Sequence, residues 1–361
     1  MSCAWRIKFT LTIGLALSMS VGVLAQSVRV GVLGLFHPDQ IILGVPSGSA
    51  LILRAGQKML VLEPSAGAGA AHMRLSGDTI VVDAGSGSMR GHDVIVRARQ
   101  NGAADFTLAI PGKITRHYLG TLQLKPIAGS LVAIVSMDLE TAVASVVAAE
   151  SAPDTPLEAL KAQAVATRSY FTASRGRHHD FDFCDTTHCQ FLRNPPVLGT
   201  PVAQAVAETR GLVLAYRSEP IPVMYTRSCS GRTRTPADVG LAPGGYPYFS
   251  VDCRYCREHP TRWLRQLSAQ EIEQLHPASE TDRLKIGRRL GWNTVPSDTF
   301  SVKHAGDTML LEGTGQGHGI GLCQTGASAM AREGATFLRI LAHYYPNTTI
   351  VSRDRTAASV R

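Results

Sequence analysis

The chain of 361 residues lacks the motifs of several common site types. It contains no GxGxxG pattern and no loop ending in GK[ST], which excludes the usual nucleotide-binding motifs. The absence of an HExxH motif argues against a zinc hydrolase of the common type. No internal repeat or low-complexity tract is present, which excludes a repeat protein.

Clustered positive charge is also missing, although the chain has 36 Lys and Arg residues against 28 Asp and Glu residues. The basic residues are scattered, with no helix-length stripe and no interleaved aromatic residues, so we expect no binding of nucleic acid. A net charge of +8 suits an anionic membrane or cell wall instead. Hydrophobic residues make up 44% of the chain, which is typical of a globular protein with a core.

Long apolar runs are missing except at the N-terminus, where Phe9–Leu24 follows the basic residues Arg6 and Lys8. Small residues occupy the cleavage positions that end at Ala25, and this pattern predicts a signal peptide over residues 1–25. An uncleaved membrane anchor is the alternative, because the run is marginal in length for crossing a bilayer. We therefore expect an exported protein of the periplasm, cell envelope or exterior, with no transmembrane segment after cleavage.

Cysteine is absent from the predicted mature N-terminal half, and six cysteines lie in the C-terminal half. They are Cys184, Cys189, Cys229, Cys253, Cys256 and Cys323. An even number of cysteines in an exported protein favours disulfides, with fifteen possible connectivities. The Cys253-Arg-Tyr-Cys256 spacing suits redox or metal chemistry, but no thioredoxin-like context surrounds it, so we favour two structural disulfides with Cys229 and Cys323.

Two differently built regions follow the signal peptide. Short β-branched runs such as VRVGVLGL, IILGV and LVAIVSM predict strands from Ser27 to about Ile134. Near Met137 the apolar period changes from two to 3.6 residues, which predicts helices. We therefore expect an α+β protein with a β-rich N-terminal region (26–128), a mixed α/β domain (129–350) and a C-terminal tail (351–361).

The first predicted helix, MDLETAVASVVAAE, carries a carboxylate on its apolar face. Leu139, Val143, Val146 and Glu150 share that face. Burial and the negative end of the helix dipole both favour a neutral carboxylic acid at Glu150, which is the form that protonates a glycosidic oxygen. The alternative is a polar helix end that faces solvent.

A second helix is predicted to begin at Thr155 as N-cap, with Glu158 completing a capping box and Gly176 as the stop. It carries Gln163, Arg168 and Tyr170, and Arg168 is a candidate to bind an anionic group or to orient Glu150. A solvated helix face is the alternative for these side chains. Near the C-terminus, SAMAREG and TFLRILAHYY predict one last helix.

The segment HHDFDFCDTTHCQ concentrates side chains that bind soft metals. Its candidate ligands for a tetrahedral zinc site are His178, Cys184, His188 and Cys189. A Cys184–Cys189 disulfide flanked by two surface histidines explains the same spacing, and both possibilities stay open at this point.

Four segments together resemble the SpoIID/LytB family of bacterial cell-wall proteins over roughly residues 115–350. They are AAESAPDTPLEALKAQAVATRSYF, CDTTHCQFLR, RSCSGRTRTPADV followed by YPYFSVDC, and GQGHGIGLCQTGASAMAREGATFLRILAHYYPNT. The resemblance implies a lytic transglycosylase that cleaves the MurNAc–GlcNAc bond of peptide-stripped glycan strands and leaves a 1,6-anhydro end. It places the catalytic acid at Glu150 and an active-site arginine at Arg168.

Some members of that family bind zinc through a His/Cys cluster, and the resemblance places this cluster at His178, Cys184, His188 and Cys189. The glycines of GTGQGHGIGLCQTG then become sites of close backbone approach beside the two helices. Gln163, Tyr170, Ser228, Ser230, His318 and Gln324 become candidates for binding the sugar, and structural hydrogen bonding is the alternative for His318 and Gln324.

The sequence departs from many relatives at two places. The loop reads SCSGRT without a second adjacent glycine, which puts substrate contacts near Arg232 in doubt, and the region from Ser268 to Gly291 is short. The alternative function is a cell-wall-binding protein, itself without catalytic activity, that enhances an N-acetylmuramoyl-L-alanine amidase.

Overall fold

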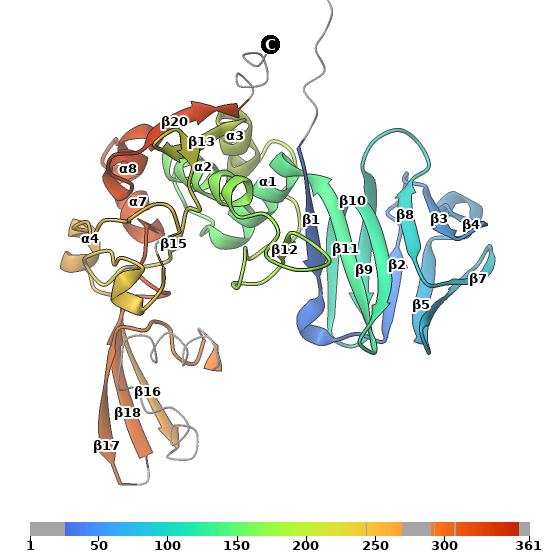
Figure 1. Ribbon diagram of the computed structural model, residues 1–361, viewed down its shortest axis with the longest axis horizontal. Helices are drawn as coiled ribbons and strands as arrows, with labels where there is room; N and C mark the ends of the chain where they lie inside the picture. Colours follow the sequence, from blue (N-terminus) through green and yellow to red (C-terminus); the bar gives the residue numbers. More distant parts are fainter. Residues whose placement is uncertain (1–25, 243, 269–289, 292, 307, 354–361) are drawn as a thin grey trace, which may run out of the picture.

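The computed structural model describes residues 26–242, 244–268, 290–291, 293–306 and 308–353 (Figure 1). The predicted signal peptide lies outside the described residues, as do most of the tail and most of the region from Ser268 to Gly291. Within the described ranges, no helix has both the length and the apolar character needed to cross a membrane. The fold is α+β with a β-rich N-terminal region, which confirms the predicted class.

One large sheet forms the N-terminal region. Its strands are β1 (Ser27–Val32), β2 (Gln40–Gly44), β3 (Leu51–Ala55), β4 (Lys58–Leu62), β5 (Ala70–Ser76), β6 (Thr79–Ala84), β7 (Gly87–Gly91), β8 (Val94–Ala98), β9 (Ala104–Ile110), β10 (Ile114–Ile127), β11 (Ser130–Asp138) and β12 (Phe183–Cys184). Short 3-10 helices occupy Gly34–Phe36, Pro64–Ala66 and Ala237–Val239. Buried and partly buried residues alternate along β9, as expected where one face of a strand packs on a core.

The longest strand, β10, pairs with different strands along its length. Residues 114–120 pair with β9, whereas residues 121–127 pair with β11 and part of that stretch also pairs with β8. Gly120 stands at the change with a φ of 151°, and a Cβ there would lie 2.4 Å from the carbonyl oxygen of Ser136. Glycine is required at this position because a side chain would collide with the neighbouring strand.

Two strands carry this sheet into the second region. β11 pairs antiparallel with β1 and leads directly into the first helix, and β12 pairs parallel with the other side of β1. Both β11 and β12 lie beyond residue 128 and so belong to the second region. Buried residues of the sheet and of the helices form one continuous core. The residues on either side of β12 are therefore held against the edge of the sheet, beside the helices.

The central helices are α1 (Leu139–Glu150), α2 (Leu157–Ala173) and α3 (Pro201–Glu208). Asp138 caps α1 by accepting bonds from the backbone N–H groups of Glu140 and Thr141. The predicted capping box of the second helix is wrong, because α2 begins at Leu157 and its N-cap is Pro156 without a side-chain bond. The Glu158 carboxylate instead binds the Lys161 ammonium and a backbone N–H at the start of α8.

The C-terminal region packs a second core against α2. It comprises β13 (Leu212–Tyr216), β14 (Glu219–Pro220), β15 (Tyr225–Thr226), α4 (Arg254–Glu258), β19 (Leu322–Cys323), α7 (Gln324–Arg332), α8 (Phe337–Tyr344) and β20 (Thr349–Ser352). The prediction of one last helix is wrong, because Gly334 adopts a φ of 87° and separates α7 from α8.

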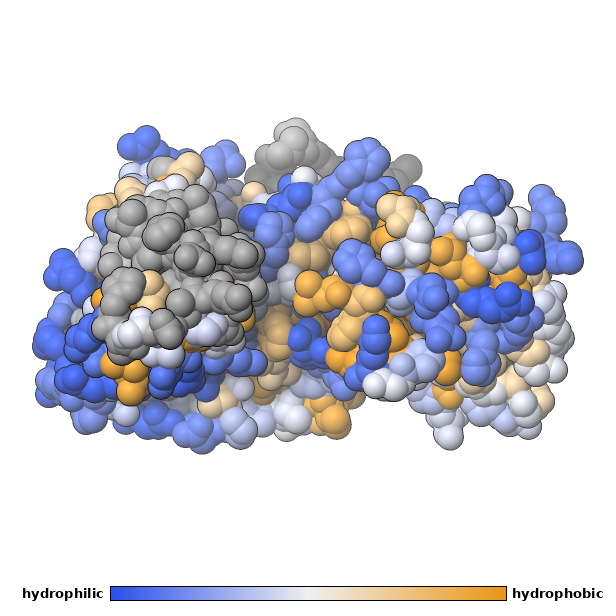
Figure 2. All heavy atoms as spheres, turned by 90° about the horizontal axis from the view of Figure 1, so that it is seen from below, coloured by the Kyte–Doolittle hydropathy of each residue, from blue (hydrophilic) through white to orange (hydrophobic). Residues whose placement is uncertain are grey.

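A small sheet of β16 (Arg262–Ser268), β18 (Thr308–Thr314) and β17 (Phe300–Ala305) extends from the C-terminal region, away from the large sheet (Figure 1). Seen from below, apolar side chains gather over the N-terminal sheet region, and hydrophilic side chains dominate the outer margin of the C-terminal region (Figure 2). The helices α1 and α2 lie between these two regions.

Candidate active site

Glu150 is the last residue of α1, at the end of the helix's buried stripe. Burial raises the pKa of its carboxyl to about 7, and this outweighs the opposing effect of the Arg227 and Arg193 guanidinium groups. The carboxyl therefore keeps a large neutral fraction near neutral pH. This is the state that the sequence pattern predicts for a general acid.

The main chain of Glu150 is fixed by two side chains from distant segments. Arg227 Nη1 donates to the Glu150 carbonyl oxygen at 3.0 Å, and Gln324 Nε2 donates to the same oxygen at 3.4 Å. A carbonyl at a helix C-terminus has no partner within its own helix, so these donors satisfy it from outside. They join the end of α1 to the segment after β15 and to the start of α7.

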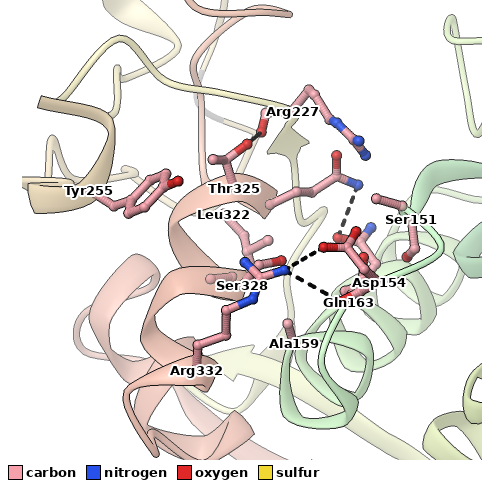
Figure 3. A pocket seen from close by; sticks show the side chains of 14 residues that line it. Ser151, Asp154, Ala159, Gln163, Arg227, Tyr255, Leu322, Thr325, Ser328 and Arg332 are labelled. Carbon is pink, nitrogen blue, oxygen red and sulfur yellow. Dashed lines mark hydrogen bonds and ion pairs between the residues drawn. The ribbon is translucent and has the colours of Figure 1, made fainter. Parts of the chain in front are cut away.

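A hollow of about 170 Å³ lies next to this junction. It is lined by the turn between α1 and α2, by Ala159 and Gln163 of α2, by Arg227, and by residues of α7 (Figure 3). Asp154 and Arg332 form an ion pair of 2.7 Å between the turn and α7. Glu150 directly precedes the first lining residue, Ser151, and so stands at the border of the hollow.

The structure brings two of the predicted sugar-binding residues together in this hollow. Gln163 is buried on α2, and its Oε1 atom lies 3.5 Å from Nε2 of Gln324. The amide of Gln324 thus contacts both Gln163 and the end of α1. These amides have hydrogen-bonding capacity toward a hydroxyl-rich ligand.

The glycine-rich stretch 313–326 packs on protein backbone, as the sequence predicts. A Cβ on Gly321, whose φ is 73°, would lie 2.0 Å from the Met224 carbonyl oxygen. This close approach allows β19 to pair with β15 and to place Gln324 at the start of α7. Residues 313–326 therefore serve to position Gln324 beside α1.

Ser228, Ser230 and His318 are not among the residues that line the hollow. Ser228 is buried, and its Oγ lies 3.3 Å from the Thr261 hydroxyl. The Nδ1 atom of His318 accepts a bond from the backbone N–H of Ile320 within its own loop. These hydrogen bonds of Ser228 and His318 hold the loops in place.

Arg168 is buried and turned away from Glu150. Its guanidinium forms two bonds to the Glu140 carboxylate, at 2.8 and 2.6 Å, and donates to the carbonyl oxygens of Leu212 and Val206. Glu140 precedes Glu150 by ten helical residues, which is about 15 Å along the axis. The structure thus places Arg168 at the opposite end of α1 from the candidate acid.

Tyr170, the last of the predicted sugar-binding residues, is buried against Phe171 and Phe183. Burial raises the pKa of its phenol well above the ordinary value, and the nearby Cys189 thiol adds to this effect. Its hydroxyl lies toward the His/Cys cluster rather than the hollow.

The sequence analysis missed three groups around the Glu150 carboxyl: Arg193, Arg227 and Tyr225. Burial raises the pKa of Tyr225, and the charge of Glu150 adds to the shift, so the two groups are close. The Tyr225 hydroxyl donates to the side-chain carbonyl of Gln190. Arg193 and Gln190 belong to the CDTTHCQFLR motif, and that motif was the signal available for finding them.

The predicted ligands His178, Cys184, His188 and Cys189 converge beside β12, and their ligand atoms lie within 4.8 Å of one another. His178 Nε2 is 3.3 Å from Cys189 Sγ, and His188 Nδ1 is 3.7 Å from Cys184 Sγ. Tetrahedral zinc with bonds of about 2.0 Å to nitrogen and 2.3 Å to sulfur separates such ligands by about 3.5 Å. The donor set and its spacing therefore fit one zinc ion.

The six described cysteines form no disulfide in this structure. The expected pairing among Cys229, Cys253, Cys256 and Cys323 is therefore not observed, and neither is a Cys184–Cys189 bridge. The four thiols of the first group instead converge in a second cluster. Spacing along the chain does not distinguish a disulfide from a shared metal, whereas sulfur–sulfur distances do.

Comparison with known proteins places these residues in a family. The family model described as SpoIID, Stage II sporulation protein, matches residues 128–216, which include α1, α2 and the His/Cys cluster. The chain is 28% identical to Stage II sporulation protein D of Bacillus subtilis (strain 168), covering 61% of this chain and 76% of that protein.

Two further relatives extend the comparison. An uncharacterized protein of Brachyspira hyodysenteriae is 29% identical over 66% of this chain and 73% of its own length. The Bacillus subtilis protein named Amidase enhancer is 24% identical over 54% of this chain and 38% of its own length. The chain is thus similar to proteins of the SpoIID/LytB family, and the match to the SpoIID family model covers its central helices.

Proposed function

We propose that this protein is a peptidoglycan lytic transglycosylase in which Glu150 is the general acid and base. The similarity to SpoIID proteins and to an amidase enhancer supports a cell-wall-related function. The transglycosylase activity itself is supported by the position of Glu150 at the end of α1, directly before a residue that lines the hollow, where burial raises the pKa of its carboxyl to about 7. The substrate is the MurNAc–GlcNAc bond of glycan strands that carry no peptides.

A single carboxyl group is sufficient for this reaction. Neutral Glu150 donates its proton to the glycosidic oxygen as the bond to the MurNAc anomeric carbon breaks. The resulting carboxylate then accepts the proton of the substrate's 6-hydroxyl as that oxygen bonds to the same carbon and forms the 1,6-anhydro ring. No water is consumed, and Glu150 ends in its starting protonation state.

Hydrolysis would require a second carboxylate at a defined separation, to act as a nucleophile or to activate water. The acidic residue that lines the hollow is Asp154, and its carboxylate is held by Arg332 at 2.7 Å. Arg227 and Arg193 stabilise the Glu150 carboxylate after the first proton transfer because both guanidinium groups lower its pKa. Gln163 and Gln324 are suited to binding sugar hydroxyl or acetamido groups.

We further propose that His178, Cys184, His188 and Cys189 hold a structural zinc ion. The metal would supply a rigid crosslink, since all four tetrahedral positions are taken by protein ligands. Gln190 follows this cluster directly and accepts a bond from Tyr225, so an ordered cluster fixes the Tyr225 phenol beside Glu150. Arg193 lies a few residues further along the same segment.

The second candidate function is enhancement of a cell-wall amidase, which the name of one relative supports. It shares with the first function the expected export through residues 1–25 and the binding of peptidoglycan glycan strands. It does not require Glu150 to act as an acid.

Product analysis separates the two functions. Purified protein is incubated with peptide-free glycan strands, and 1,6-anhydromuramyl ends are counted by mass spectrometry. We expect such ends with the native protein and none with Glu150→Gln, whereas Glu219→Gln, the same change at an exposed position, should remain active. Equal product from Glu150→Gln would refute the catalytic function, and amidase stimulation without anhydro ends would favour the second candidate.

A further inference from the structure

Four buried thiols from three segments of the chain converge in the C-terminal region. This four-cysteine cluster comprises Cys229 after β15, Cys253 and Cys256 at α4, and Cys323 at the end of β19. Each of the four residues is at most 3% exposed, and their sulfur atoms all lie within 4.8 Å of one another. We propose that the four-cysteine cluster binds one structural zinc ion with tetrahedral geometry, separate from the His/Cys cluster beside β12.

The sulfur positions fit a shared metal better than two disulfides. Cys256 Sγ and Cys323 Sγ are 3.6 Å apart, whereas bonded sulfurs are about 2.05 Å apart. Four thiolates around zinc, each bonded at about 2.3 Å, lie about 3.8 Å from one another in a regular tetrahedron. The cluster thus has the dimensions of a single four-coordinate ion.

The local chain also has the form of a zinc-binding turn. Cys253 is the N-cap residue of α4 and Cys256 lies in that helix, so a Cys-x-x-Cys pair presents both thiols at a helix start. Cys323 is likewise the N-cap residue of α7, and its sulfur accepts a bond from the Gly326 N–H at 3.4 Å. Such bonds stabilise metal-bound thiolates.

The surroundings leave no room for larger groups. A Cβ on Gly326 would lie 2.4 Å from Cys253 Sγ and 2.2 Å from the Tyr344 hydroxyl oxygen. The Tyr344 hydroxyl lies 3.5 Å from Cys253 Sγ, and the Ser228 hydroxyl lies 3.6 Å from Cys256 Sγ. These hydroxyls are positioned to donate to buried, negatively charged sulfur. An all-thiolate tetrahedral set favours zinc over calcium or magnesium, which prefer oxygen ligands.

A metal in the four-cysteine cluster would hold in place two residues that contact Glu150. Arg227 stands two residues before Cys229, and Gln324 directly follows Cys323. Both side chains donate to the Glu150 carbonyl oxygen. A metal here joins the loop after β15 to α4 and α7, and so fixes the two donors that hold the end of α1.

Metal analysis of the full chain tests the proposal directly. The protein is purified without chelator from medium containing zinc and iron, and its metals are measured by inorganic mass spectrometry. We expect Cys256→Ser to lose one equivalent of zinc per chain relative to the native protein. The matched control Cys184→Ser, which alters only the His/Cys cluster, should retain that equivalent. Unchanged zinc in Cys256→Ser, iron in place of zinc, or disulfides among the four cysteines in non-reducing peptide maps would overturn the proposal.

A second measurement covers the case in which Cys256→Ser does not fold. In the Cys184→Ser protein, zinc is exchanged for Co²⁺, and the absorption spectrum is recorded. We expect thiolate-to-cobalt charge transfer with the intensity of four sulfur ligands, together with the visible bands of tetrahedral cobalt. A spectrum without these bands overturns the proposal. Neither measurement depends on glycan cleavage, so this result and the test of Glu150 are independent.

Discussion

The pH dependence of glycan cleavage is the most direct consequence of the Glu150 environment. The first proton transfer requires the neutral acid, so kcat/KM should fall as pH rises through the pKa of free Glu150. With a pKa of about 7, the neutral fraction falls about tenfold between pH 6 and pH 8. With the ordinary value of 4.5, the same interval would lower it roughly hundredfold.

A charge change near the carboxyl should move this profile in a defined direction. Arg227 lowers the pKa of Glu150, so Arg227→Met should raise it and extend activity to higher pH. The substitution also removes the bond from Arg227 to the Glu150 carbonyl oxygen, so the maximal rate is expected to fall as well. The midpoint of the profile, rather than the maximal rate, therefore reports the electrostatic effect.

The assay is the initial rate of 1,6-anhydromuramyl formation from peptide-free glycan strands, measured from pH 5 to pH 9 at constant ionic strength. A rate that does not change between pH 6 and pH 8, or one that falls a hundredfold, would contradict the assigned pKa. A profile whose midpoint moves to lower pH in Arg227→Met would contradict the assigned role of Arg227.

Two further predictions concern stability. The folded pKa of Glu150 lies above its ordinary value of 4.5, so its ionisation favours the unfolded chain: stability is fully present below pH 4.5 and is lost as pH rises through about 7. Glu150→Gln should therefore raise the free energy of unfolding at pH 8 by up to about 3 kcal/mol, with little change at pH 4, as measured by urea denaturation. A loss of stability at pH 8 would count against the raised pKa of Glu150. Arg168→Met leaves the Glu140 carboxylate without its partner and should destabilise the fold by about 3–5 kcal/mol, with part of the loss recovered in the double variant with Glu140→Leu. If Arg168→Met instead raises KM at unchanged stability, Arg168 contacts the substrate.

Local periodicity was enough to predict the elements that carry the candidate acid. The stripe of Leu139, Val143 and Val146 predicts α1 and places Glu150 on its buried face, and the structure confirms the helix and the burial of that stripe. The β-branched runs predict the strands of the N-terminal sheet for the same reason, since each element must bury one face. These properties depend on residues close together in the chain.

Helix ends were predicted less well because several local signals compete there. Thr155, Pro156 and Glu158 form a good capping sequence, yet Glu158 binds Lys161 and the start of α8 instead. The C-terminal pattern predicts one helix, but Gly334 in the left-handed region separates two. Contacts with distant segments decided which local signal prevailed.

The sequence by itself determined the α+β class, the place of Glu150 at the end of the buried stripe of α1, and the grouping of His178 with Cys184, His188 and Cys189. Only the tertiary structure decided that Arg227 and Gln324 hold Glu150, that Arg168 binds Glu140, and that four cysteines from three segments meet at one point. The physical reason is the separation along the chain of the residues that interact. Periodicity and capping act within a few residues, whereas an ion pair, a raised pKa or a metal cluster depends on groups that become neighbours only when distant segments share a core.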